Sequence, residues 1–84
     1  MDERPSIRNL LGTTIKDLRL KKKLSQQQLA DLAGLDRTFV NGIERGVHNP
    51  TAVTLVRLAI ALEILPSDLF KRFTKAVLDR ISNE

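Results

Sequence analysis

Four polar side chains recur in one stretch of the sequence with the spacing of a helix face. They are Arg37, Thr38, Asn41 and Arg45, at positions i, i+1, i+4 and i+8. A guanidinium can bind guanine through two hydrogen bonds, an amide can bind adenine in the same way, and a threonine methyl can contact thymine. These residue types therefore suit the reading of base edges in a major groove. The alternative is the ordinary solvated face of an amphipathic helix.

Two short helices in tandem are expected to position these side chains, within residues 24–46. Ser25 is a favoured N-cap, and Gln28 three residues later completes a capping box. The first helix is expected to stop at Gly34, because glycine reaches the left-handed backbone region without a Cβ clash. Asp36 is expected to cap the second helix. A short helix, a glycine turn and a second short helix form the helix-turn-helix plan.

This stretch resembles the helix-turn-helix of the lambda-repressor/Cro superfamily, the XRE-like regulators. The resemblance rests on S-Q-x-x-L-A-x-x-A-G-L, then D-R-T-F-V-N-G-I-E-R-G and N-P-T, and covers about residues 11 to 65. Within the superfamily, the chain is most similar to the controller proteins of restriction–modification systems, which often carry an L-D-R-T-aromatic run, an I-E-R segment and one extra C-terminal helix. The resemblance implies an all-α, compact five-helix lambda-repressor-like DNA-binding domain.

Composition narrows the class of protein. The chain has 84 residues, enough for one domain, with a net charge of +4 and a pI near 10.0, which favours a polyanionic partner. It has no cysteine, so disulfides and thiolate metal sites are excluded. Because the sequence shows no nucleophile–base arrangement, metal-ligand spacing or phosphate-binding loop, we expect no enzyme activity, no metal and no cofactor. We also expect a cytoplasmic protein of a bacterium or phage, associated with the nucleoid and not with a membrane.

The remaining helices follow from apolar periodicity. Residues 6 to about 23 predict a first helix, although Gly12 weakens its middle and allows a start nearer Leu10. Residues 51–63 predict a fourth helix that is apolar almost all round. A fifth helix, capped by Ser67, is expected over about 66–82.

An apolar fourth helix must be covered on more than one side, and a chain of this size has little else to cover it with. The sequence therefore predicts a homodimer, as the resemblance also implies, with the C-terminal helix contributing. Packing within one chain is the alternative for the same side chains. The candidate interface residues are Val56, Ile60, Ile64, Leu65, Phe70, Phe73 and Val77.

The candidates for base reading are Arg37, Thr38 and Asn41, and four residues around them are candidates for contacts to the DNA backbone. Gln26 stands at the positive end of the helix that precedes the reading helix, and the loop after the reading helix usually touches the DNA backbone in the family that the chain resembles. For Asn41, a phosphate or water contact is the alternative to adenine. The four candidates are Gln26, Arg45, His48 and Asn49.

The resemblance implies one structural ion pair, between Arg19 and Glu44, and a function. We expect a sequence-specific regulator of transcription, an autoregulatory controller of a restriction–modification operon, which binds double-stranded DNA as a homodimer on pseudo-palindromic sites. Two dimers on adjacent DNA sites are a further candidate assembly. RNA polymerase is a further candidate partner, with the exposed acidic residue Asp31 as the candidate contact. A phage-type repressor, an antitoxin of the same fold and an adaptor that binds no DNA are the alternatives.

Overall fold

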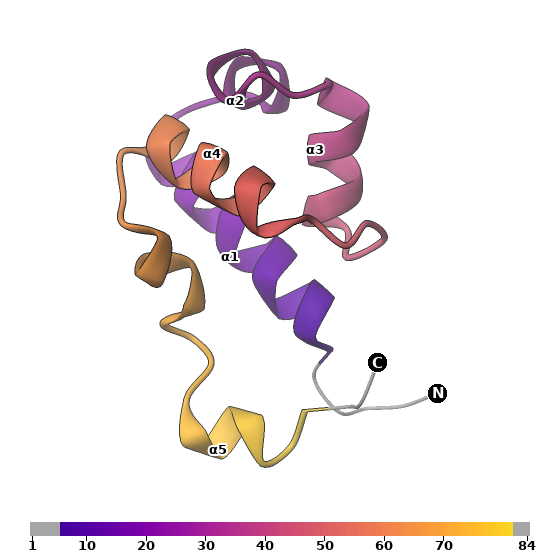
Figure 1. Cartoon of the computed structure of the whole chain (residues 1–84), viewed down its shortest axis with the longest axis vertical. Coiled ribbons are helices and arrows are strands. Elements are labelled where there is room, and N and C mark those ends of the chain that lie inside the picture. The colour runs from indigo at the N-terminus through magenta and orange to yellow at the C-terminus, as the bar shows by residue number, and fades with distance from the viewer. Residues whose placement is uncertain (1–5, 82–84) are drawn as a thin grey trace.

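The computed structural model describes residues 6–81, and within that range every regular element is helical. The all-α fold is therefore confirmed. Five α-helices and one 3-10 helix follow one another within the described residues. Their bounds are α1 Ile7–Lys21, α2 Gln26–Ala33, α3 Arg37–Glu44, α4 Ala52–Leu62, η1 Pro66–Phe70 and α5 Lys75–Leu78. In Figure 1, α2 lies at one end of the molecule, α4 crosses in front of α1, and α3 stands beside both.

Hydroxyl side chains set most of the helix starts. The Ser25 hydroxyl accepts the Gln28 backbone N–H at 3.0 Å, while the Gln28 side chain accepts the Ser25 N–H at 2.8 Å, so the expected capping box is present. Ser6 caps α1, which begins at Ile7 and not near Leu10. Asp36 occupies the N-cap position of α3 but makes no side-chain cap hydrogen bond, so its expected capping role was wrong.

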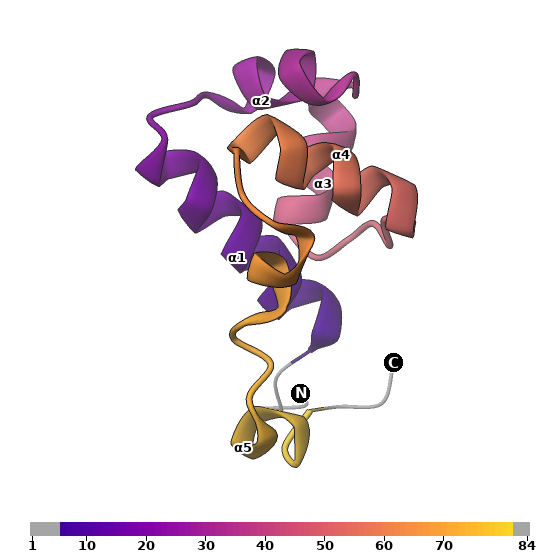
Figure 2. The same cartoon turned by 60° about the vertical axis from the view of Figure 1, so that its left-hand side comes forward.

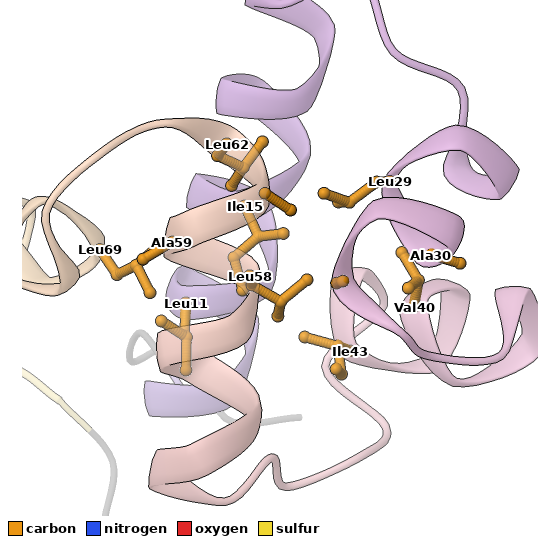
Figure 3. Close-up of a cluster of buried hydrophobic side chains, with 12 residues drawn as sticks. Leu11, Ile15, Leu29, Ala30, Val40, Ile43, Leu58, Ala59, Leu62 and Leu69 are labelled. Carbon is orange, nitrogen blue, oxygen red and sulfur yellow. The ribbon is translucent and has the colours of Figure 1, made fainter.

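One apolar core joins all the elements except α5. Figure 3 shows side chains from α1 to α4 and from η1 pointing toward one another between the helices. Fully burying an aliphatic side chain of this size contributes roughly 1.5–3 kcal/mol to folding. The largest fully buried side chains are Ile15, Leu29, Val40, Ile43, Leu58, Leu62 and Leu69.

Gly12 is required for packing and does not mark a weak point of α1. A Cβ built on Gly12 would lie 2.2 Å from the carbonyl oxygen of Ile43 and 2.8 Å from that of Glu44. The backbones of α1 and α3 therefore cross at Gly12 with no room for a side chain. The sequence could not reveal this contact, because the partner atoms lie about thirty residues away.

The single helix expected over 66–82 was wrong within the described residues. The chain instead forms η1, which begins at Pro66, and the short α5. Thr74 separates them, because its backbone is extended (φ −76°, ψ 165°) and its hydroxyl accepts the Val77 N–H at 3.3 Å, which starts a new helix. Figures 1 and 2 place α5 at the end of the molecule opposite α2, and none of its residues is buried.

Candidate nucleic-acid interface

Of the four side chains expected on the polar face of the reading helix, α3, three are exposed and the fourth, Asn41, is half-buried. Arg37 is the first residue of this helix, Thr38 follows it, and Arg45 is its C-cap; all three are exposed. Among the described residues, no carboxylate forms an ion pair with either arginine. Both guanidinium groups are therefore available to an external anion or base.

A buried ion pair holds α3 against α1. Arg19 Nε donates to Glu44 Oε2 at 2.7 Å, and Arg19 Nη2 donates to Glu44 Oε1 at 3.0 Å. The side chains are only 9% and 2% exposed. Arg19 Nη1 also donates to the carbonyl oxygen of Leu24, just before α2, at 2.8 Å. The pair expected between Arg19 and Glu44 is thus present, and it links α1 and α3 to the start of the helix-turn-helix.

Two amides extend this pair toward the exposed face. Gln26 Nε2 donates to Glu44 Oε1 at 3.0 Å, and Asn41 Nδ2 donates to Gln26 Oε1 at 3.3 Å. Both amide side chains are on half-buried residues. The sequence assigned Gln26 to a phosphate, but its side chain is engaged within the protein. Its backbone N–H, in the first turn of α2, is one of the groups that a helix leaves without an internal acceptor.

The loop after α3 folds back onto that helix. The ring of His48 stacks on Phe39 with centroids 5.2 Å apart and an interplanar angle of 27°. A Cβ on Gly42 would lie only 1.9 Å from His48 Cδ2, so the glycine makes room for the imidazole ring and not for the wall of a groove. The backbone N–H groups of Val47 and His48 both donate to the carbonyl oxygen of Gly42, at 2.8 and 3.2 Å. Sequence reasoning missed this packing, for which a glycine inside a polar-faced helix was the only signal.

His48 and Asn49 are exposed and lie in the loop that follows α3 and its C-cap Arg45. The residues expected to contact DNA therefore come from the start of α2, from α3 and from the loop that follows it. Within residues 6–81, no group of three or more His, Cys, Asp or Glu side chains could hold a metal ion. No described helix is long and apolar enough to cross a bilayer.

The comparisons with known proteins agree with this geometry. A helix-turn-helix family model matches residues 15–69, which include the second half of α1 and all of α2, α3 and α4. The chain belongs to this family. It is a DNA-binding regulator of transcription of the XRE type, as the sequence motifs had indicated.

Several individual relatives are controller proteins of restriction–modification systems or other regulators. The control protein C.SmaI of Serratia marcescens is 38% identical over 66 residues, which is 79% of each chain. The crystal structure of the restriction–modification controller C.AhdI from Aeromonas hydrophila is 47% identical, covers 74% of this chain and 94% of its own, and superposes with a TM-score of 0.73. The biofilm regulator SinR, solved in complex with DNA, is 29% identical, with a TM-score of 0.69 over 73% of this chain and 98% of its own. The resemblance to controller proteins is thereby confirmed.

Proposed function

We propose that this chain is an autoregulatory controller of a restriction–modification operon, which binds a pseudo-palindromic operator as a homodimer. The observation that carries the proposal is the start of α3. There Arg37 and Thr38 are exposed and have no carboxylate partner among residues 6–81, while the buried Arg19–Glu44 pair fixes the helix. The likeness to C.SmaI and C.AhdI, both controllers by name, supports the operon context.

In this proposal α3 enters the major groove and α2 crosses the DNA backbone. Arg37 binds guanine through two hydrogen bonds, Thr38 offers its methyl to thymine, and Asn41 binds adenine. Backbone contacts come from Arg45, His48, Asn49 and the N-terminal backbone of α2 at Gln26. The net charge of +4 supports association with DNA.

The apolar surface that lies outside the core supports the homodimer. Ile60 on α4 is 70% exposed and Leu65 is 67% exposed, and Val56 and Phe70 are exposed as well. Val77 is half-buried, whereas Ile64 and Phe73 are half-buried because they pack against the core of the same chain. Large apolar side chains that stay exposed on a folded domain are typical of an interface between proteins. Two dimers on adjacent sites, and a contact of RNA polymerase with the exposed Asp31, belong to the same proposal.

The test of function is a titration of the protein against the DNA upstream of its own gene, beside a scrambled duplex of equal length, at two salt concentrations. A sequence-specific regulator binds the upstream DNA roughly a thousandfold more tightly than the scramble. Equal binding to both duplexes, with a steep loss in salt, would leave only phosphate attraction and refute the proposal. Methyltransferase and nuclease genes beside this gene are expected; a toxin gene would instead favour the antitoxin.

Two variants separate the roles within the site. Arg37→Ala is expected to lose about 1–3 kcal/mol on the operator and to relax preference at one base pair. Asn49→Ala is expected to weaken binding to all duplexes alike, because a phosphate contact carries no sequence information. A uniform loss for Arg37→Ala, or a loss at one base for Asn49→Ala, would exchange their roles.

The homodimer is tested separately. Ile60→Asp should shift the dimer toward monomer in analytical ultracentrifugation.

A further inference from the structure

We propose that the buried Arg19–Glu44 pair dictates, through Gln26, which end of the Asn41 amide faces the DNA, and so makes Asn41 select adenine over guanine. The inference rests on the proposed function, because it requires α3 to lie in the major groove. Gln26 is then a positioning residue for base recognition. Four side chains from three helices form the chain of hydrogen bonds that carries this selection.

The first step is fixed by charge. The Arg19 guanidinium has only donors, and a carboxylate paired with it has only acceptors. Glu44 Oε1 accepts from Arg19 Nη2 and from Gln26 Nε2, each at 3.0 Å. Because Glu44 is buried and bonded by two arginine nitrogens, it can accept from Gln26 but cannot donate to it.

The second step transfers this polarity to the two amides. An isolated amide can rotate by half a turn and exchange its donor and acceptor ends. Gln26 cannot, since a rotated amide would set its oxygen against the oxygen of Glu44. Its Oε1 therefore faces Asn41, and only the Nδ2 end of Asn41 can bond to it, as observed at 3.3 Å.

The third step concerns what Asn41 has left to offer. One N–H of Nδ2 is used on Gln26, so the amide keeps one N–H donor and the acceptor Oδ1. Adenine presents the complementary pair in the major groove, with N7 as acceptor and the N6 amino group as donor. Guanine presents two acceptors, N7 and O6, and would leave Oδ1 facing an oxygen. The hydrogen-bond chain therefore favours adenine, which an unrestrained asparagine would favour less.

A phosphate contact by the Gln26 side chain is the competing explanation. The phosphate contact and the positioning of Asn41 predict different effects of Gln26 on the affinity for different duplexes. A phosphate contact contributes equally on every sequence. Positioning through Asn41 contributes at one base pair and only while Asn41 is present. The difference can be measured as an energetic coupling between the two residues.

The experiment uses the full chain, its operator and a set of duplexes in which each base pair is replaced in turn. Asn41→Ala first locates the base pair, as the position at which this variant erases a preference of the wild type. Gln26→Met then keeps the length of the side chain and removes its polarity. It should fold like the wild type, since Arg19 still pairs with Glu44, and a thermal melt checks this. Gln27→Met is the matched control, because Gln27 is the next residue along, is exposed, and its side chain bonds to Asp31 rather than to the Glu44 network.

We expect Gln26→Met to reduce the preference for adenine over guanine at that position about tenfold, within the range of a bidentate base contact. Adding Gln26→Met to Asn41→Ala should not change the preference further, and Gln27→Met should leave the whole profile unchanged. If Gln26→Met weakens all duplexes alike and its effect adds to that of Asn41→Ala, Gln26 is a phosphate contact and the inference is wrong. If preferences exist elsewhere but none depends on Asn41, the inference fails while the proposed function stands. If the wild type shows no base preference at all, both fail.

Discussion

Replacing Gly12 by alanine tests the close crossing of α1 and α3. The new Cβ would lie 2.2 Å from the carbonyl oxygen of Ile43 and 2.8 Å from that of Glu44. Both oxygens belong to the backbone of α3, so neither can rotate away. Ordinary contacts between carbon and carbonyl oxygen are about 3.3 Å or longer, so the two helices must separate by about 1 Å.

Two terms of opposite sign decide the outcome. Alanine is favoured over glycine inside a helix by about 1 kcal/mol. Overpacking typically destabilises a protein by about 1–3 kcal/mol. A clash between a new side chain and backbone atoms lies at the upper end of this range, about 3 kcal/mol, because the backbone cannot rotate away. The net loss is then about 2 kcal/mol, which for a domain of this size lowers Tm by about 8–16 °C.

A thermal melt followed by circular dichroism gives the answer. The matched control is Thr13→Ala, at the exposed neighbouring position of the same helix, which gains helix propensity and meets no backbone. We expect the control to melt at or slightly above the wild type and Gly12→Ala to melt well below both. A Gly12→Ala protein as stable as the control would show that α1 and α3 are not in contact here, and the placement of α3 would be wrong.

Two further predictions concern charge. Removing either Arg19 or Glu44 leaves the other charge buried and unpaired, which should cost about 3–5 kcal/mol, whereas replacing both by methionine should cost far less than the sum; urea unfolding of the four proteins measures this, and strict additivity would contradict it. The hydrogen bond from Lys71, and after it the bond from the Leu65 N–H, lowers the pKa of Asp68 below its ordinary value of 3.8. Because the folded pKa is lowered, the stabilisation is present above pH 3.8 and is lost as the pH falls through the folded pKa. Asp68→Asn should therefore flatten the fall of Tm between neutral and strongly acid pH, and an unchanged slope would count against the Lys71 contact.

Local signals in the sequence predicted the helix-turn-helix well. A capping box and a helix-ending glycine act over three or four residues. Whether they form therefore depends little on the rest of the chain. Ser25 and Gln28 form the expected reciprocal bonds, and Gly34 takes the expected left-handed backbone with φ 69°. The Arg19–Glu44 pair is not of this kind, since its partners are 25 residues apart. It was expected only because the chain resembles a family.

Where the sequence misled, a distant contact or a competing local signal decided the structure. Gly12 costs helix propensity, but the crossing with α3 requires it. The apolar seam of 66–82 suggested one helix, whereas Thr74 restarts the chain and α5 buries nothing. Asp36 has the right type and position for a cap, yet its side chain makes no such bond. At Gly12 a contact from another helix overrode the local rule, and at Thr74 a second local signal, the hydroxyl cap of a new helix, overrode the apolar periodicity.

In the candidate interface, too, some features could be predicted from the sequence and others depend on tertiary contacts. The residue types on α3 follow from helical spacing, so Arg37, Thr38 and Asn41 could be named from the sequence. The hydrogen-bond partner of an amide cannot be named from the sequence. The side chains of Gln26 and Asn41 can bond to many groups, and the tertiary structure determines which of these groups lies within reach. That choice matters, since an amide with one N–H already occupied keeps one donor and one acceptor, which match adenine better than guanine. The Glu44 carboxylate, whose side chain is only 2% exposed, accepts a hydrogen bond from Gln26 and thereby orients the amide of Asn41. Substitutions at Glu44 should therefore alter both the stability of the domain and the base that Asn41 selects, whereas substitutions at Arg37 should alter binding alone.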